Sequence, residues 1–269
     1  MSNKKPFFNR TRLLLGDENM NSLDSVRVII FGVGGVGSWC AEGLVRSGVG
    51  HITIVDSDRV CITNVNRQMM ATSCTVGMVK VEALKERLME INPDVEVDAV
   101  QAIYSEETAG RFDLDSFDYV IDAIDSLKDK ASLILHATRS KAKFFSSMGA
   151  ALKLDPRKVE VTEFWKVRGC PLARALRQRF KKRKEFPAKK FLCVFSDEVI
   201  PNQGKESSCG TDRCVCPKST SASGDPALAN HEWCSSKAMI NGSLMHVTAI
   251  FGLTLAGLVI SDVTTQRRS

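Results

Sequence analysis

A glycine-rich turn is the feature that most constrains how this chain folds. Residues 32–37 read Gly-Val-Gly-Gly-Val-Gly and follow an apolar, β-branched run at residues 26–31. Such a run is typical of a buried parallel strand, and residues 38–46 have the pattern of a helix. In this G-x-G-x-x-G spacing, the first glycine permits a tight turn, the second lets the backbone approach a ligand, and the third lets the helix pack on the strand. The sequence therefore predicts the strand–turn–helix unit that opens a Rossmann-like domain.

Strands and helices alternate through the first 150 residues. Further runs predict strands at residues 52–55, 95–100, 119–123 and 143–146, with helices at residues 79–91 and 128–140. This alternation predicts an α/β fold, a Rossmann-like and mostly parallel sheet with helices on both faces. Past Gly149 the pattern changes. The C-terminal part is expected to extend the fold with strands at residues 158–165 and 190–196, a helix that begins at Pro171 and an apolar helix at residues 243–260.

The charge of the chain is unevenly distributed. The formal net charge is +6, but residues 166–190 hold eleven lysines and arginines and a single acid, Glu185. A local excess of that kind indicates an anionic partner that docks at one place. In the helix after Pro171, four cations share one face at intervals of three and four residues: Arg174, Arg177, Lys181 and Lys184. Such a face fits a phosphate backbone, and it also fits an ordinary solvated helix surface.

Polar side chains follow the predicted strands at the edge of the sheet where ligands bind in such folds. Asp56 ends the second strand, 19 residues after Gly37, where an acid can hydrogen-bond the hydroxyls of a ribose. The helix after the glycine turn offers free N–H groups to anionic oxygens at its N-terminus. The sequence therefore predicts a nucleotide site made of the following residues: Gly32, Gly34, Gly35, Gly37, Asp56, Asp58, Asn64, Arg67, Gln68, Lys80, Asp122 and Asp125.

Three of these residues select the nucleotide. The cations Arg67 and Lys80 suit the neutralisation of a triphosphate, and Asp125 at a strand end can hold Mg²⁺ through one carboxylate. A nicotinamide dehydrogenase has no evident use for the three, so ATP with Mg²⁺ is the expected ligand. Each residue also has an ordinary structural interpretation: a loop ion pair for Arg67, a solvated helix position for Lys80, and a helix N-cap for Asp125.

This set of motifs resembles the adenylating domain of the ubiquitin-activating-enzyme superfamily. Besides the glycine turn, the resemblance lies in Asp56, the Asn-Val-Asn-Arg-Gln run at residues 64–68, Lys80 and the Asp-Ala-Ile-Asp segment at residues 122–125. Bacterial members include the adenylyltransferases for molybdopterin synthase and for the thiamine sulfur carrier. In these dimeric enzymes an arginine near the N-terminus reaches the ATP of the partner subunit, and Arg12 matches its position. The resemblance therefore implies a homodimer whose sites are completed across the interface.

Within the superfamily, the chain resembles the tRNA threonylcarbamoyladenosine dehydratases. The similarity is carried by residues 8–16, 121–126, 147–152, 153–176 and 193–196. It implies a cytoplasmic, ATP-dependent enzyme that binds tRNA and cyclises the threonylcarbamoyl side chain of an adenosine through an adenylated carboxylate. The catalytic residues that it implies are Arg67, Lys80, Asp125 and, from the other subunit, Arg12, with Asp125 as the Mg²⁺ ligand. A monovalent cation and a sulfur-transfer or carrier protein are further candidates for cofactor and partner.

The chain is expected to contain two parts with different functions. Residues 1–150 would form the Rossmann-like, ATP-binding adenylation domain. Residues 151–269 would form an extension for substrate binding and dimerisation, and it contains a mobile loop predicted at residues 201–233, which are rich in small and polar side chains.

An alternative within the same superfamily is the activation of the C-terminus of a ubiquitin-like sulfur-carrier protein. The adenylyltransferases that do so carry a four-cysteine zinc site built from two C-x-x-C pairs, and this sequence has no C-x-x-C. Cys209, Cys214 and Cys216 have a spacing outside the usual zinc patterns, and a metal site completed by Cys234 or His231 is the alternative to a flexible loop with free thiols. Zinc is therefore not expected.

The remaining features concern the location of the protein. Most of the nine cysteines stand in apolar runs, which indicates a reducing cytoplasm, and residues 1–12 lack the apolar segment of a signal peptide. The apolar helix at residues 243–260 is at the short limit for a membrane span. His246, Gly252 and Gly257 favour a buried or dimer-interface helix there, so stable membrane insertion is not expected, with membrane association as the alternative.

Overall fold

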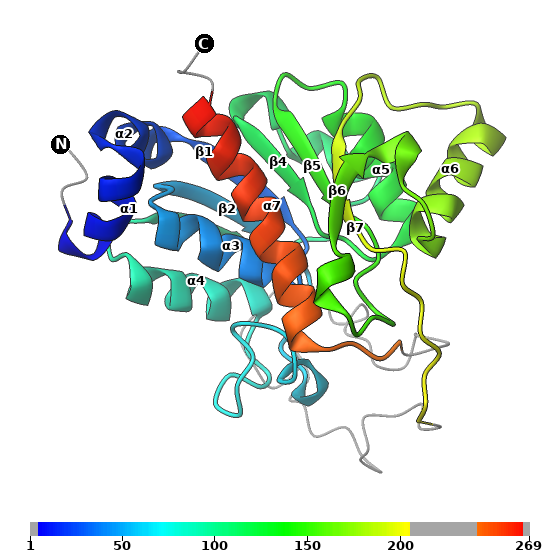
Figure 1. The fold of residues 1–269 in the computed structure, drawn as a ribbon, viewed down its shortest axis with the longest axis horizontal. Helices are drawn as coiled ribbons and strands as arrows, with labels where there is room; N and C mark the ends of the chain where they lie inside the picture. The colour runs from blue at the N-terminus through cyan, green and yellow to red at the C-terminus, as the bar shows by residue number, and fades with distance from the viewer. Residues whose placement is uncertain (1–4, 205–240, 266–269) are drawn as a thin grey trace.

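The structure is a computed structural model that describes residues 5–204 and 241–265. Its centre is a seven-stranded sheet in the order β3-β2-β1-β4-β5-β7-β6 (Figure 1). The strands are β1 (Arg27–Phe31), β2 (His51–Val55), β3 (Glu96–Val100), β4 (Tyr119–Asp122), β5 (Lys143–Ser147), β6 (Glu160–Glu163) and β7 (Leu192–Phe195). Neighbouring strands are parallel except for β6 and β7. The predicted Rossmann-like, mostly parallel sheet is confirmed.

Helices cover both faces of the sheet. On one face lie α3 (Gly37–Ser47), α4 (Lys80–Ile91) and α7 (Met245–Thr265), and on the other lie α5 (Leu127–Ala137) and α6 (Pro171–Arg183) (Figure 1). Two short helices, α1 (Asn9–Leu15) and α2 (Asp17–Ser25), stand at the N-terminus.

The two faces of β1 belong to two different hydrophobic cores. Val28 and Ile30 lie in the core beneath α3, α4 and α7, and Ile29 and Phe31 lie in the core beneath α5 and α6. Successive side chains of a strand point to opposite faces, so a strand covered on both sides is apolar at every position. This is why the run at residues 26–31 predicts the strand so directly.

The part of the chain after residue 150 extends the same sheet. β7 pairs with β5, with Ser146 opposite Cys193, so the predicted boundary between residues 1–150 and 151–269 falls inside one sheet. β6 is shorter than the predicted strand at residues 158–165, because the chain enters a 3₁₀ turn at Phe164–Lys166. The predicted loop at residues 201–233 lies outside the described residues apart from its first four positions.

The apolar helix α7 lies diagonally across α3 (Figure 1). By length and composition alone it is the one helix in the described part of the chain that could cross a membrane, and half of its apolar window is buried. Val247, Phe251 and Leu255 are fully buried and belong to the core of the first face. A Cβ at Gly252 would overlap the carbonyl oxygen of Val36, so the glycine lets α7 approach α3 closely. The buried face of α7 is therefore part of the fold, as predicted.

Candidate functional site

The glycine turn connects β1 to α3 at the carboxyl ends of the parallel strands. Gly32 has a φ of 84°, and a Cβ there would meet the Ala123 carbonyl oxygen at 2.8 Å. A Cβ at Gly37 would overlap the Gly32 carbonyl oxygen. Only glycine fits at these two positions, because a side chain would push β1, β4 and α3 apart. The switch point of the sheet lies here, between β1 and β4.

Asp56 and Lys80 lie together beside the turn. Asp56 Oδ2 accepts a hydrogen bond from the Val33 backbone N–H at 2.8 Å, and Oδ1 accepts one from the Asp58 N–H at 2.9 Å. Lys80 Nζ lies 2.7 Å from Asp58 Oδ2 and 3.9 Å from Asp56 Oδ1. Lys80 is only 6 % exposed, so it is not a solvated helix residue.

The charges of this pair stabilise one another. Burial raises the pKa of Asp56, and the ammonium of Lys80 opposes that shift. Burial also lowers the pKa of Lys80, but the carboxylates of Asp56 and Asp58 outweigh it, and the net direction is upward. Lys80 is therefore a buried ammonium at the edge of the turn whose charged form is favoured by its carboxylate partners, which suits a site for phosphate oxygens.

Asn64 is the last residue of the 3₁₀ helix Ile62–Asn64, and Gln68 follows it in the next turn. Asn64 is buried, and its Oδ1 accepts a hydrogen bond from the Cys61 N–H at 3.0 Å, which folds this turn. Gln68 is 6 % exposed, and its Oε1 receives no hydrogen bond from any described residue. A buried acceptor without a donor is costly, so Gln68, next to Gly34, is suited to a ligand or an ordered water.

Arg67 is held from three directions. Its Nη1 donates to the Thr63 carbonyl oxygen and to Asn66 Oδ1, both at 2.9 Å, and its own carbonyl accepts from Trp39 Nε1 at 3.0 Å. Asn66 Nδ2 in turn donates to the Ser243 carbonyl oxygen at 2.9 Å, just before α7. The predictions from sequence missed Asn66 as a site residue, although it stands inside the Asn-Val-Asn-Arg-Gln run.

Asp125 faces the same cluster. Burial lowers the pKa of the Arg67 guanidinium and the charge of Asp125 opposes this, and Asp125 also raises the pKa of Lys80. The N-cap of α5 is Ser126, whose Oγ accepts the Asp129 N–H, so Asp125 does not cap the helix. The structure therefore brings Arg67, Lys80 and Asp125 together at one place, as the motif order predicts.

Asp122 does not belong to the surface of this site. Its side chain is fully buried, 2.8 Å from Lys130 Nζ, and it accepts hydrogen bonds from Ser146 Oγ at 2.6 Å and from the Ile124 N–H at 3.1 Å. The prediction of direct nucleotide contact is corrected for Asp122, because its carboxylate points into the core and is occupied. It instead fixes the loop that carries Asp125.

Arg12 is not brought to the site of its own chain. It lies on α1, where its Nε is 3.2 Å from Asp17 Oδ1. Figure 1 shows α1 at the side of the molecule, away from the N-terminal end of α7 that borders the glycine turn. A role for Arg12 in nucleotide binding therefore requires a second copy of the chain.

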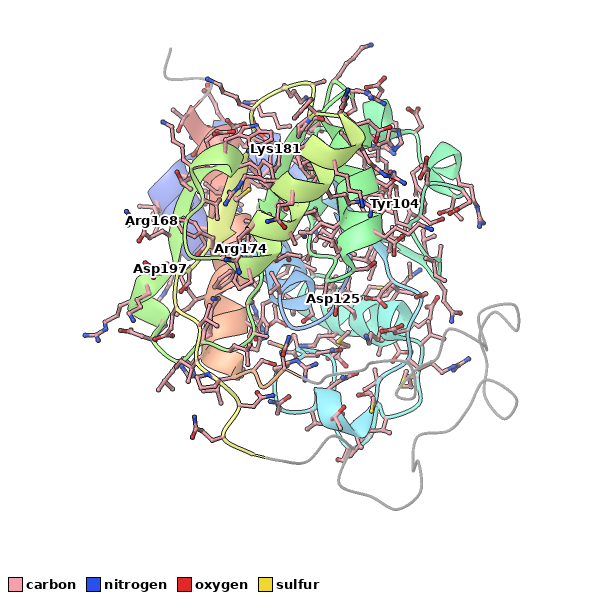
Figure 2. All side chains as sticks on the ribbon, turned by 90° about the vertical axis from the view of Figure 1, so that its right-hand side faces the viewer. Tyr104, Asp125, Arg168, Arg174, Lys181 and Asp197 are labelled. Atoms are coloured by element: carbon pink, nitrogen blue, oxygen red, sulfur yellow. The ribbon has the colours of Figure 1, made fainter. Side chains whose placement is uncertain are left out.

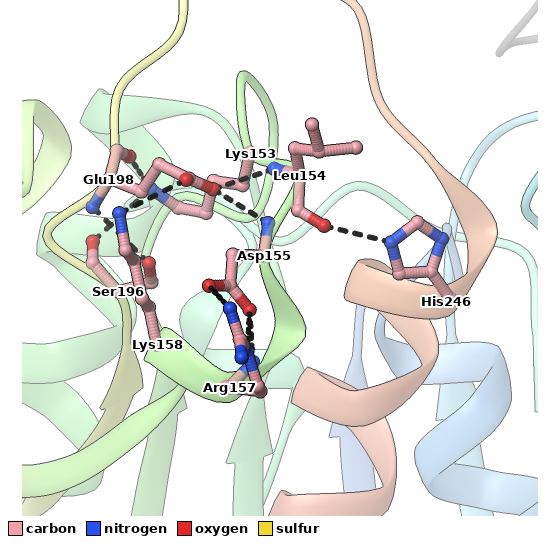
Figure 3. Close-up of polar contacts among 8 residues, drawn as sticks. All are labelled: Lys153, Leu154, Asp155, Arg157, Lys158, Ser196, Glu198 and His246. Carbon is pink, nitrogen blue, oxygen red and sulfur yellow. Dashed lines mark hydrogen bonds and ion pairs between the residues drawn. The ribbon is translucent and has the colours of Figure 1, made fainter.

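The chain around Leu152 joins both flanks of residues 205–240. Leu152 has a φ of 60°, its N–H donates to the Gly242 carbonyl oxygen, and its own carbonyl accepts from the Ile200 N–H. Around it, a polar cluster is formed by Lys153, Leu154, Asp155, Arg157, Lys158, Ser196, Glu198 and His246 (Figure 3).

This polar cluster ties three chain segments to one another. Lys153 Nζ donates to the carbonyls of Ser196 and Glu198 at 3.1 and 2.5 Å. Glu198 Oε2 accepts the N–H groups of Leu154 and Asp155, and His246 Nε2 lies 2.9 Å from the Leu154 carbonyl oxygen (Figure 3). The sequence offers only the Asp155-Pro156 turn as a signal for it. The start of α7 is thereby fixed relative to β7 and to the glycine turn.

The basic residues of α6 divide into two groups. Arg174 and Lys181 are exposed and lie on the face of the molecule that also carries Asp125 (Figure 2). Arg177, by contrast, is partly buried: its Nη1 donates to the Phe164 carbonyl oxygen at 3.1 Å, and its guanidinium lies over the Phe164 ring. The predicted face of four cations is wrong for Arg177, because that side of the helix packs on the core.

The predicted cysteine and histidine candidates for metal binding, Cys209, Cys214, Cys216, His231 and Cys234, lie outside the described residues. Within residues 5–204 and 241–265, no group of three or more histidine, cysteine or acidic side chains is arranged to hold a metal ion by itself.

The doubly wound sheet, with a glycine turn at its switch point and a buried lysine beside it, defines a Rossmann-like α/β protein. The chain belongs to the ThiF family, whose sequence pattern matches residues 8–266. It is similar to the tRNA threonylcarbamoyladenosine dehydratase of Bacillus subtilis, with 38 % identity over 258 residues that cover 95 % of this chain and 94 % of the relative. The predicted membership of this group is confirmed.

A solved structure supports the same relationship. The crystal structure of the Escherichia coli tRNA N6-threonylcarbamoyladenosine dehydratase in complex with ATP superposes with a TM-score of 0.78 and 30 % identity, over 97 % of this chain and 95 % of that one. Similarity to the Escherichia coli molybdopterin-synthase adenylyltransferase is more limited: 30 % identity over 64 % of this chain and 68 % of the relative.

Proposed function

We propose that this chain is an ATP-dependent enzyme that cyclises threonylcarbamoyladenosine in tRNA with the loss of water. The observation that carries the proposal is the convergence of charges beside the glycine turn: Arg67 packs against Gly35, and Lys80 lies 3.9 Å from Asp56 Oδ1. The charge of Asp125 acts on both cations. The chain that holds them aligns over 95 % of its length with an enzyme named for this dehydration.

The chemical difficulty is that a carboxylate is a poor electrophile. Attack of a carboxylate oxygen on the α-phosphorus of ATP releases pyrophosphate and forms an acyl adenylate. A nucleophile in the same side chain then attacks the acyl carbon, closes the ring, expels AMP and gives its proton to solvent. The carboxylate oxygen leaves with AMP, so the nucleoside loses one water overall. No protein thiol takes part.

The residues of the site have matching roles in this proposal. Lys80 and Arg67 offset the charge of the phosphates as pyrophosphate leaves. Asp125 would hold Mg²⁺, which prefers one or two carboxylates plus phosphate and water, and the ion would supply positive charge beside the phosphates. Asp56 has acceptor capacity left beyond its two backbone hydrogen bonds, which suits a ribose hydroxyl. Gln68 offers its unpartnered Oε1 to a donor of the nucleotide or to a bound water.

A homodimer would complete the site. Arg12 would act on the ATP of the partner chain, since α1 stands apart from the site of its own chain. Leu13 and Leu14 beside it are 80 % and 82 % exposed, and a second copy that covers them would bury apolar area. The exposed cations Arg174 and Lys181 would lie against the tRNA backbone, and the proposed location is the cytoplasm.

Pyrophosphate release from ATP tests the proposal. The enzyme is supplied in turn with tRNA that bears threonylcarbamoyladenosine, with a ubiquitin-like carrier protein, or with neither, and only the tRNA is expected to drive release. Lys80→Met and Asp125→Asn should each lower kcat by about 100-fold or more, because charge stabilisation of the transition state is lost. Lys85→Met, on the same helix, is the matched control. Removal of Mg²⁺ by chelation should stop release. Release driven by the carrier protein alone contradicts the proposal.

A further inference from the structure

Two aromatic side chains near the C-terminal end of α6 are exposed and close together. Trp165 is 39 % and Phe186 is 51 % exposed, and their ring centroids lie 6.2 Å apart. Trp165 stands in the 3₁₀ turn before α6, and Phe186 stands three residues after its last residue, Arg183. Exposed aromatic pairs are unusual on a surface that is otherwise rich in lysine and arginine.

The Trp165 ring is held in place from beneath. The fully buried Phe164 contacts it edge-on at a centroid distance of 5.2 Å, and Phe164 itself stacks on Phe191 at 5.0 Å. The Glu163 carboxylate also accepts a hydrogen bond from the backbone N–H of Trp165 at 3.0 Å, which fixes the turn that carries the ring. A ring fixed by core contacts loses little conformational entropy when a second ring stacks on it.

The charges around the pair are uncompensated. Lys166, Lys182 and Lys184 are exposed, and no described acidic side chain lies within ion-pair distance of any of them. The nearby Glu185 is engaged by Arg183 at 4.0 Å. Aromatic rings amid free cations are the combination that binds unpaired nucleotides, because bases stack on the rings while phosphates meet the cations.

The pair lies at the end of α6 that is remote from β5. α6 begins beside the carboxyl end of β5, where a Cβ on Gly149 would lie 3.7 Å from Leu172 Cβ. Its thirteen residues span about 20 Å at the rise of an α-helix. The exposed Arg174 and Lys181 lie along the helix between the two ends (Figure 2).

We propose that Trp165 and Phe186 form a stacking surface for an unpaired nucleotide of the RNA substrate. Lys166 and Lys184 contact the phosphates that flank it. This inference rests on the proposed function and narrows its substrate class: an RNA with an unpaired nucleotide, besides the adenosine that is modified, that reaches the C-terminal end of α6.

Tryptophan fluorescence tests the contact directly. Stacking of a base on Trp165 should quench its emission when single-stranded oligo(U) or the substrate tRNA is added, and Trp165→Leu should remove that part of the quenching. Trp165→Leu and Phe186→Leu should each raise the KM for tRNA about 5- to 150-fold, the range expected for the loss of one stacked base. Trp165→Phe keeps a stacking face and should retain most of the affinity. The KM for ATP and the thermal midpoint should not change.

Phe7→Leu is the control, because Phe7 is similarly exposed, at 53 %, and lies in the 3₁₀ turn Pro6–Phe8 directly before α1, which stands on the opposite side of the molecule from α6 (Figure 1). Unchanged tRNA affinity in the folded Leu variants overturns the inference. A loss of dimer instead of a loss of RNA affinity also overturns it and assigns the pair to a protein contact. If oligo(U) quenches Trp165 while no RNA drives pyrophosphate release, the proposed function fails and the stacking surface stands.

Discussion

The ammonium of Lys130 and the carboxylate of Asp122 lie 2.8 Å apart with both side chains fully buried. Lys130 also donates to the Ile124 carbonyl oxygen at 2.9 Å. The pair therefore connects α5 to the end of β4 and fixes the backbone just before Asp125. A structural ion pair beneath the site holds the proposed Mg²⁺ ligand in place.

Removing one partner of this pair should be costly. Lys130→Met leaves the Asp122 charge buried and uncompensated, and we expect a loss of about 3–5 kcal/mol in the free energy of unfolding. Urea denaturation measures the loss. Lys128→Met, at an exposed position on the same helix, is the control and should cost less than about 0.5 kcal/mol. Equal stability of the two variants would show that the buried pair contributes nothing.

Two glycines of α7 should respond differently to alanine. At Gly252 a Cβ would overlap the Val36 carbonyl oxygen and lie 2.8 Å from Trp39 Cβ, whereas at Gly257 it would meet nothing within 4 Å. Gly252→Ala should therefore destabilise the protein by about 1–3 kcal/mol as α7 is pushed from α3. Gly257→Ala should leave stability unchanged or raise it by up to about 1 kcal/mol through helix propensity. Thermal unfolding of both variants decides, and a neutral Gly252→Ala would refute the close crossing.

The bridge from Arg67 through Asn66 to Ser243 should support ATP binding. Asn66→Leu removes both hydrogen bonds, whereas Asn66→Asp keeps an acceptor for Arg67 and loses the donor to Ser243. Each lost hydrogen bond is expected to weaken ATP binding about 3- to 10-fold. The Leu variant loses two and the Asp variant one, so the affinity of the Asp variant should lie between those of the wild type and the Leu variant. Equilibrium titration with ATP measures this. Asn21→Leu, at an exposed position, is the control. If the two Asn66 variants bind ATP as tightly as this control, Asn66 does not belong to the site.

The cations of α6 should separate into an RNA-binding and a structural group. Arg174→Ala with Lys181→Ala should reduce the salt dependence of tRNA binding by about 0.7–0.9 in log–log slope for each phosphate that a cation no longer neutralises. Their exposed positions predict no change in stability. Arg177→Ala should instead lower stability by about 1–2 kcal/mol, since it removes the hydrogen bond to the Phe164 carbonyl and the packing on its ring. A stability loss in the Arg174 and Lys181 variant, with no stability loss in Arg177→Ala, would contradict the packing of α6.

Glu198 should make stability depend on acidity. The N–H groups of Leu154 and Asp155 lower its pKa below the ordinary value of 4.5. A carboxyl with a depressed pKa stabilises the fold above its unfolded pKa, and this contribution is lost as the pH falls through the folded pKa. Glu198→Gln should therefore have a lower free energy of unfolding than the wild type at neutral pH, and this difference should disappear at strongly acidic pH. Urea unfolding of both proteins along a pH series measures the difference, and parallel profiles would contradict it.

The sequence by itself determined the fold class and the grouping of most residues of the candidate nucleotide site. The glycine turn and the alternation of strands and helices are local patterns, and local sterics and side-chain periodicity fix what they form. Because parallel strands end at one edge of the sheet, the order of Asp56, Arg67, Lys80 and Asp125 along the chain was enough to place them together.

The tertiary structure alone decided which polar side chains face the site and which face the core. Asp122 and Asp125 stand three residues apart at the end of one strand, yet the first is sealed against Lys130 and the second faces Arg67 and Lys80. Arg174 and Arg177 are likewise three apart on one helix, and only packing against Phe164 separates them. Periodicity groups residues on a face, but the direction of that face depends on the elements that pack against it, and these come from distant parts of the chain.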